Sequence, residues 1–191
     1  MNQRLFVAID LPDSVVDTLD RLCTGLPGAR WIDPDQYHLT LRFIGEVDGL
    51  VARDIDVGLA ELEFEPFTLN LAGFGHFPPR GVPKVLWAGI SPREPVDRLR
   101  RAVDRVVNAA GVEPEHRKFS PHVTVARFPS GAPISRLQQF FAGHALYRSE
   151  PFEVDRFHLY SSQLHQDGAI HTLEATYAVE EEEEQDEWWR R

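Results

Sequence analysis

The stretch His38-Leu39-Thr40-Leu41 decides the fold, because its pattern returns 84 residues later as His122-Val123-Thr124-Val125. Each copy is a histidine, an aliphatic residue, a threonine and a second aliphatic residue. Side chains at i and i+2 of a β-strand point to the same face. Each copy is therefore expected to place an imidazole and a hydroxyl on one face of a strand, with its two aliphatic residues buried behind them.

The repeat also predicts the architecture. Each copy is followed closely by a basic residue and a phenylalanine, Arg42-Phe43 in the first case and Arg127-Phe128 in the second. The spacing is near half of the body of the chain, which favours an internal duplication with pseudo-two-fold symmetry. Two motif strands that face one another would bring two imidazoles and two hydroxyls around one small volume. Such a volume suits acid–base chemistry on a bound anion.

Hydrophobic periodicity predicts a mixture of strands and helices. Strands are expected at residues 4–10, 30–32, 37–45, 66–77, 84–90, after Pro121, at 152–160 and at 170–178. Helices are expected at residues 14–25, 50–61, 95–110 and 133–142. Gly73 and Gly75 inside one strand suggest a bulge or a close approach of two backbones. This order predicts an α+β fold.

Length and charge limit the function. With 191 residues, 42% of them hydrophobic, the chain is long enough for one domain with two lobes, expected at residues 1–178. Residues 179–191 read as an acidic, disordered tail that contains Trp188 and Trp189. The net charge of −10 argues against a wide basic surface for duplex nucleic acid. A small anionic ligand or the end of an RNA remains compatible with it.

The arginines of residues 95–110 leave two readings open. They form either a solvated helix face balanced by acidic neighbours or a patch that faces RNA. They are Arg98, Arg100, Arg101 and Arg105.

Cellular location is also constrained. The chain has no apolar run that could span a bilayer, its N-terminus opens directly into a strand-like segment, and we find no signal peptide. The single cysteine, Cys23, cannot form an internal disulfide. We therefore expect a cytoplasmic protein with no membrane partner, and a monomer.

The motif residues indicate a chemistry. Imidazole has an ordinary pKa of about 6.5, so one of two facing histidines can be neutral while the other is charged. Thr40 and Thr124 can donate hydrogen bonds to phosphate oxygens, and Arg42 or Arg127 can add a charge-assisted donor. The sequence shows no His-x-x-x-His pair with a third ligand, no cysteine cluster and no Asp-rich loop. Neither a metal nor a cofactor is therefore expected.

These motifs resemble the 2H phosphoesterase family, which is named for two His-x-Thr/Ser-x motifs. The chain is most similar to the RNA 2′,3′-cyclic phosphodiesterase branch, also called 2′-5′ RNA ligases. Five blocks in order, within residues 4 to 178, carry the resemblance: Arg4 to Leu11, His38 to Gly45, Gly73 to Pro78, Val85 to Gly89 and Phe119 to Arg127.

The resemblance implies two similar lobes, each a small antiparallel sheet with outer helices, that face one another across a central groove. It also implies that water opens a 2′,3′-cyclic phosphate at an RNA or nucleotide 3′ end to a 2′-phosphate, with possible 2′-5′ ligation as the reverse reaction with an RNA 5′-hydroxyl. His38 would be the proton donor and His122 the proton acceptor, an assignment that rests on the resemblance alone. The two threonines would hold the phosphate.

Four further residues are candidates for contact with the substrate. Arg127 would contact the phosphate, although its spacing from His122 requires a bulge or a strand end. Arg42 has the right parity to share the face of His38. Phe119, or less favourably Phe6, could stack on a base.

Two alternatives to this function stay open. One is an RNA- or nucleotide-binding module without turnover. The other is a phosphodiesterase for a different cyclic phosphate or for a 2′-5′ linkage. The remaining histidines lack a threonine partner and are read as structural, with His76 the strongest exception because it lies in a matching block.

Overall fold

A computed structural model describes residues 2–165 and 168–179 of the chain. Within this part, nine β-strands, four α-helices and one 3₁₀ helix follow one another. The strands are β1 (Gln3–Asp10), β2 (Arg30–Trp31), β3 (His38–Val47), β4 (Phe67–Phe77), β5 (Val85–Ser91), β6 (Val123–Arg127), β7 (Phe152–Val154), β8 (Arg156–His165) and β9 (Gly168–Ala178). The helices are α1 (Asp13–Leu22), η1 (Pro34–Gln36), α2 (Gly49–Ala60), α3 (Glu94–Ala109) and α4 (Ile134–Gly143).

All strands belong to one curled antiparallel sheet with the order β7-β4-β5-β6-β3-β1-β8-β9, and β2 pairs with β6 beside this path. The two motif strands, β3 and β6, are neighbours at its centre, where Leu39 pairs with Val123. Four strands lie on each side of this junction in corresponding order. The predicted α+β fold with two pseudo-symmetric lobes is confirmed, and the sheets of the two lobes are joined edge to edge.

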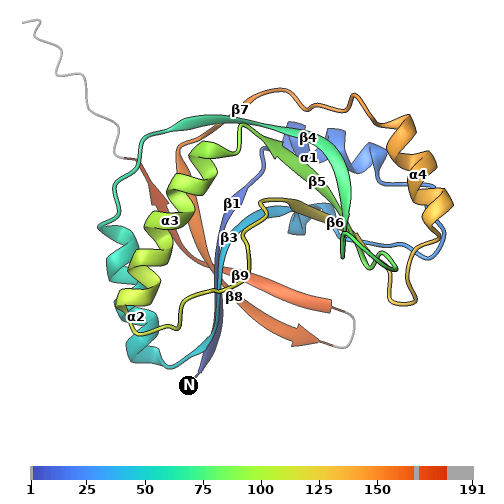
Figure 1. The fold of residues 1–191 in the computed structure, drawn as a ribbon. Coiled ribbons are helices and arrows are strands. Elements are labelled where there is room, and N and C mark those ends of the chain that lie inside the picture. Colours follow the sequence, from blue (N-terminus) through green and yellow to red (C-terminus); the bar gives the residue numbers. More distant parts are fainter. Residues whose placement is uncertain (1, 166–167, 180–191) are drawn as a thin grey trace, which may run out of the picture.

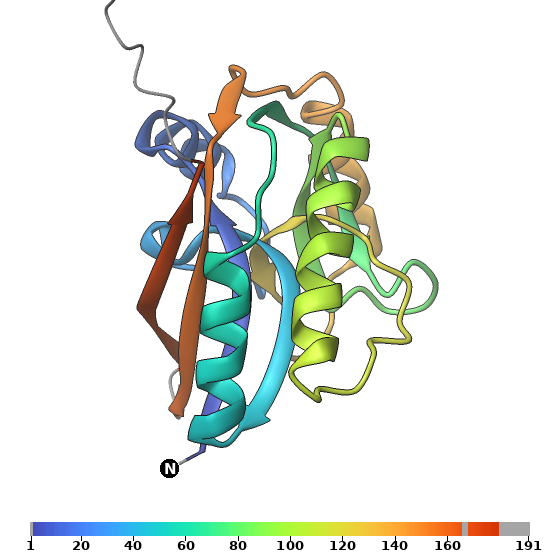
Figure 2. The same ribbon diagram turned by 90° about the vertical axis from the view of Figure 1, so that its left-hand side faces the viewer.

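Helices cover the outer side of the sheet. Helices α2 and α3 lie side by side over the lobe that contains β1 and β3 (Figure 1; Figure 2), while α4 contacts β4 in the other lobe and α1 contacts η1. Tyr177 of β9 donates a hydrogen bond to Asp56 of α2 at 2.6 Å, and Phe74 of β4 packs on Phe140 of α4 at 5.1 Å.

The core lies between the sheet and these helices. The aliphatic residues of both motifs, Leu39, Leu41, Val123 and Val125, are at most 2% exposed. Burial of such a side chain stabilises the fold by roughly 1.5–3 kcal/mol. The motif strands are therefore held in place by the residues that alternate with the histidines, which leaves the histidines free to face the other side.

Most predicted elements are observed with ends displaced by a few residues. One prediction is wrong: residues 152–160 do not form one strand, because the chain leaves the ladder at Asp155. Strand β7 pairs with β4 in one lobe, and β8 pairs with β1 in the other. An alternating pattern does not reveal that a strand changes its partner.

The bulge predicted at the strand glycines is observed at Gly73. The pairing of β4 with β5 shifts register between Leu71 and Phe74, and Gly73 has a φ of 67°. A Cβ atom at Gly75 would overlap the indole ring of Trp87. Gly75 therefore makes room for a side chain and not for a second backbone.

The predicted acidic tail, including Trp188 and Trp189, lies outside the described residues. No helix within residues 2–165 and 168–179 combines the length and apolar character that crossing a membrane requires.

Candidate active site

A bulge in β3 decides which side chains share the face of His38. Asp10 and Ala8 of β1 pair with His38 and Thr40, but the next partner, Val7, pairs with Arg42, so Leu41 is an extra residue. A bulge of this kind reverses the alternation of faces beyond it. His38 and Thr40 therefore lie on one face, and Phe43 follows them there with a side chain that is 57% exposed.

Strand β6 contains the same bulge at the matching place. Thr124 pairs with Trp87 of β5, whereas Leu86 pairs with Ala126, so Val125 is the extra residue. Beyond the bulge, Arg127 returns to the face that carries His122 and Thr124. Of the two possibilities that the sequence left for Arg127, a bulge or a strand end, the bulge is present. The pseudo-symmetric counterpart of Arg127 is Phe43.

The two motif histidines are anchored in the same way. Nδ1 of His38 lies 2.7 Å from the carbonyl oxygen of Gln36, and Nδ1 of His122 lies 2.6 Å from that of Ser120. A carbonyl only accepts hydrogen bonds, so we infer that Nδ1 carries a proton in each ring. Nε2 is then the nitrogen that is free to exchange a proton.

Aromatic side chains fix the rings further. The His38 ring lies 5.1 Å from that of Phe6 and 5.5 Å from that of His171. The His122 ring lies 4.9 Å from that of Phe77 and 6.1 Å from that of Trp87. Both imidazoles are thus packed in partly apolar surroundings.

Charged neighbours distinguish the two histidines. Asp10 is the cross-strand partner of His38. Tyr160 donates to both carboxylate oxygens of Asp10, at 2.9 and 2.7 Å, and Nε2 of His158 lies 3.5 Å from one of them. On the other strand, Arg127 is the charged neighbour of His122.

The pKa values of both histidines reflect these surroundings. Burial lowers the pKa of His38 and of His122 below the ordinary value, and the hydrogen bond to a backbone carbonyl opposes this in each. The Asp10 carboxylate raises the pKa of His38, whereas the Arg127 guanidinium lowers that of His122 further. The charges of His171 and, less strongly, of His122 also lower the pKa of His38.

The profile of the 2′-5′ RNA ligase superfamily matches residues 11–166. The chain belongs to the 2′-5′ RNA ligase superfamily. The family resemblance seen in the motifs is thereby confirmed.

Several relatives of this superfamily member carry the name RNA 2′,3′-cyclic phosphodiesterase. The protein from Aeropyrum pernix is 34% identical over 149 residues, which is 78% of this chain and 84% of the relative. The protein from Archaeoglobus fulgidus is 33% identical over 178 residues, covering 88% and 96% of the two chains. Among solved structures, TT0787 of Thermus thermophilus is 28% identical with a TM-score of 0.76, covering 92% of this chain and 97% of that one.

The fold is shared with more distant structures. LigT of Escherichia coli, solved in complex with 3′-AMP, has a TM-score of 0.75 and 24% identity. The alignment covers 95% of this chain and all of LigT.

The prediction that Arg42 shares the face of His38 is wrong. The bulge at Leu41 turns Arg42 away from His38 and toward α3, where it is 4% exposed. Its guanidinium lies 3.6 Å from Asp104 and donates to the carbonyl oxygen of Glu113 at 2.6 Å. Arg42 therefore ties a motif strand to a helix and is not a candidate for phosphate binding.

Phe119 contacts α3. The guanidinium of Arg100 on α3 lies 5.1 Å from the centre of its ring, and Arg93 donates to its carbonyl oxygen. A base-stacking role for Phe119 stays a prediction. Two of the four α3 arginines pair with acidic neighbours, Arg98 with Glu94 and Arg100 with Asp104 at 2.8 Å.

The sequence missed three residues near His38. They are Asp10, Tyr160 and His171, which separate strands bring together. Asp10 lies in the matching block Arg4 to Leu11, but no motif marks its place beside His38. His76 stacks on Phe141, with ring centres 6.1 Å apart, and the structure shows no contact between it and the motif histidines.

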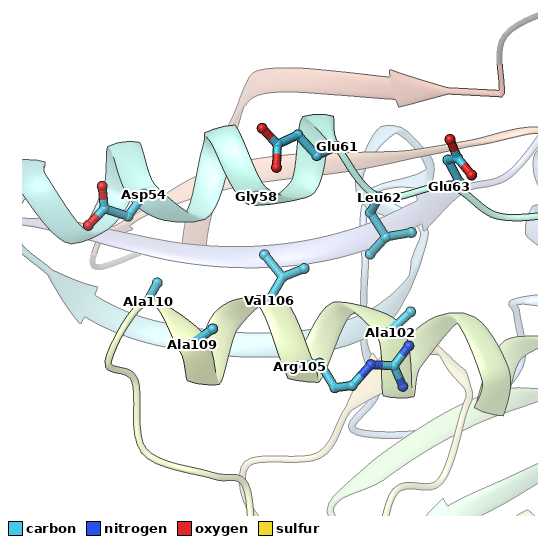
Figure 3. Close-up of a pocket in the computed structure, with 10 residues that line it drawn as sticks. All are labelled: Asp54, Gly58, Glu61, Leu62, Glu63, Ala102, Arg105, Val106, Ala109 and Ala110. Atoms are coloured by element: carbon cyan, nitrogen blue, oxygen red, sulfur yellow. The ribbon is translucent and has the colours of Figure 1, made fainter.

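Two cavities are notable within the described residues. One cavity, of about 430 Å³, adjoins His38. A larger one, of about 570 Å³, lies between α2 and α3 and is lined by Asp54, Glu61 and Arg105 (Figure 3). No motif residue lines this second cavity, so we do not place the reaction there. No group of three or more His, Cys, Asp or Glu residues in the described part of the chain is arranged to hold a metal ion.

Proposed function

We propose that this protein is an RNA 2′,3′-cyclic phosphodiesterase that uses two histidines and no metal. The observation that carries the proposal is the pair of imidazoles on adjacent motif strands. Each is held through Nδ1 on a backbone carbonyl, so both Nε2 atoms are available. The names of the relatives agree with this reaction.

The reaction follows from two proton transfers. Water attacks phosphorus while Nε2 of His122 takes its proton. The bond between phosphorus and the 3′-oxygen breaks, and Nε2 of His38 gives its proton to that oxygen. The phosphate stays on the 2′-oxygen, and exchange with solvent restores both histidines. General acid–base assistance of this kind accelerates a reaction by roughly a hundred- to ten-thousand-fold per group.

Local charge supports this direction of proton transfer. An acid must carry its proton at the start. Burial and the neighbouring His171 lower the pKa of His38, and the Asp10 carboxylate opposite His38 opposes them by favouring the imidazolium. A base must be neutral, and the Arg127 guanidinium disfavours the charged form of His122. The sequence motifs are symmetric, so the assignment of His38 as donor and His122 as acceptor gains its physical basis from these two neighbours.

The remaining site residues would bind the phosphate. Thr40 and Thr124 lie on the same faces as the histidines and can donate to the non-bridging oxygens. Arg127 can add a charge-assisted hydrogen bond as negative charge develops. We further propose that the protein is a cytoplasmic monomer, that it acts on RNA 3′ ends or nucleotides, and that it can join a 2′-5′ linkage when an RNA 5′-hydroxyl replaces water.

The test is incubation of the pure protein with an RNA that ends in a 2′,3′-cyclic phosphate, in the presence of a chelator. Analysis of the new end should show a 2′-phosphate. A 3′-phosphate product, or a need for metal, contradicts the proposed chemistry. The variants His38→Ala and His122→Ala, shown by circular dichroism to be folded, should each lose turnover.

The same assay separates the alternatives. An untouched end, together with tight binding of a cyclic nucleotide, identifies a binding module. Cleavage of another cyclic phosphate, or of a 2′-5′ linkage only, identifies a related phosphodiesterase.

A further inference from the structure

The cavity of about 430 Å³ beside His38 is built from several parts of the chain. Its size lies within the range of roughly 300–1,000 Å³ that is typical of small-molecule pockets. The end of β1, the start of α1, the 3₁₀ helix η1 and the β8–β9 hairpin contribute to its walls. The residues that line it are Phe6, Asp10, Leu11, Asp13, Val16, Pro34, Asp35, Gln36, Tyr37, His38, Tyr160, Ile170 and His171.

The position of this cavity matters because displacement at phosphorus is in line. The attacking water and the leaving oxygen occupy opposite sides of the phosphorus atom. If His38 protonates the 3′-oxygen, the ribose that carries this oxygen lies on the side of His38. The cavity adjoining His38 is then the place for the nucleoside, and this step rests on the proposed function.

One wall of the cavity suits a nucleobase. The half-buried Tyr160 ring stacks on that of Phe6, with centres 5.3 Å apart and planes 15° from parallel. Phe6 is only 2% exposed, so Tyr160 is the ring of this pair that a base can reach. The ring of His171 meets Phe6 edge-on at 4.8 Å, and its Nδ1 is buried without a hydrogen-bond partner. Aromatic side chains next to nucleotide phosphates commonly stack on bases.

The polar groups of the cavity are mostly acceptors. Asp13 and Asp35 are exposed and make no ion pair, and Gln36 uses its amide nitrogen on the carbonyl oxygen of Ala169 at 3.3 Å, which leaves its amide oxygen open. None of the lining residues is Lys or Arg. A second phosphate would be repelled here, whereas a base edge rich in N–H donors would be attracted.

We propose that this cavity is the subsite for the terminal nucleobase and that it prefers guanine. Guanine presents an N1–H and an amino group side by side, and one carboxylate can accept from both. Uracil presents a single N–H between two carbonyl oxygens, which face carboxylates unfavourably. Adenine and cytosine, with one amino group each, rank between them.

The experiment compares kcat/KM for the four nucleoside 2′,3′-cyclic monophosphates. We expect the guanosine compound to exceed the uridine compound by roughly 5- to 150-fold, the discrimination given by one bidentate contact to a base. The double variant Asp13→Asn with Asp35→Asn should bring this ratio close to one. Asp17→Asn removes a carboxylate from the same helix outside the cavity and should leave the ratio unchanged.

The outcomes separate the two proposals. Equal turnover of all four compounds overturns the base subsite and leaves the proposed function intact. A guanosine preference that survives in the double variant has the same two consequences. If folded protein hydrolyses neither these compounds nor the RNA that ends in a 2′,3′-cyclic phosphate, the proposed function fails. The cavity is then tested by calorimetry with guanosine 2′-phosphate and uridine 2′-phosphate, and equal affinities overturn it.

Discussion

Two arginines that follow the two motifs should have opposite effects when they are replaced. Arg42 has a side chain that is 3% exposed, between Asp104 and the carbonyl oxygen of Glu113. Arg42→Met keeps most of the packing volume but removes a charge-assisted hydrogen bond worth roughly 1.5–3 kcal/mol. Asp104 keeps Arg100 at 2.8 Å, so the loss should stay below the roughly 3–5 kcal/mol of an unpaired buried charge.

The expected loss of about 2–3 kcal/mol corresponds to a fall in Tm of roughly 5–10 °C for a protein of this size. The value of kcat at a temperature where the variant is folded should not change, because Arg42 points away from His38. Arg127→Met should behave in the opposite way. Its side chain is exposed, so Tm should hold, while the loss of a donor to the transition state should lower kcat by roughly 10²–10³-fold.

Thermal unfolding by calorimetry and steady-state hydrolysis of a cyclic nucleotide measure both quantities for both variants. The reasoning is refuted if Arg42→Met loses turnover at an unchanged Tm. It is also refuted if Arg127→Met retains full turnover.

Three further predictions concern pH and packing. Turnover needs neutral His122 and protonated His38, so the rate should rise as pH passes the pKa of His122 and fall as it passes that of His38. Burial lowers both pKa values, so the optimum in a pH–rate profile should lie below about pH 6.5, the ordinary value for imidazole. Asp10→Asn should move the alkaline limb of that profile to lower pH, because the imidazolium of His38 loses its carboxylate neighbour, and an unmoved limb would contradict the role of Asp10. Gly75→Ala should destabilise the protein by roughly 1–3 kcal/mol in denaturant unfolding, because the new methyl group overlaps Trp87; an unchanged midpoint would show that this approach is not tight.

Much of the fold could be predicted because its main signals are local and occur twice. The alternation in His38 to Leu41 and in His122 to Val125 is enough to place two strands with a shared chemistry. The spacing of Arg127 also predicts a bulge or a strand end, because an ideal strand would turn this residue away from His122. These inferences need only the geometry of a single strand.

The failures come from properties that no single strand contains. The parity of Arg42 looked correct because nothing in the sequence marks Leu41 as an extra residue, and only pairing with β1 shows it. His171 was read as structural because it approaches His38 only after the β8–β9 hairpin folds toward η1. Asp155 ends one strand because the chain changes partners there, which depends on the curl of the whole sheet.

The central claim is that His38 gives a proton to the leaving 3′-oxygen and His122 takes one from water. The direct test uses a cyclic substrate in which sulfur replaces the 3′-oxygen, because a thiolate leaves without protonation. The account predicts that this substrate restores most of the activity of His38→Ala, whereas His122→Ala stays roughly 10²–10⁴-fold below the unmodified protein. Restoration of His122→Ala with no benefit to His38→Ala would contradict the account and reverse the two roles.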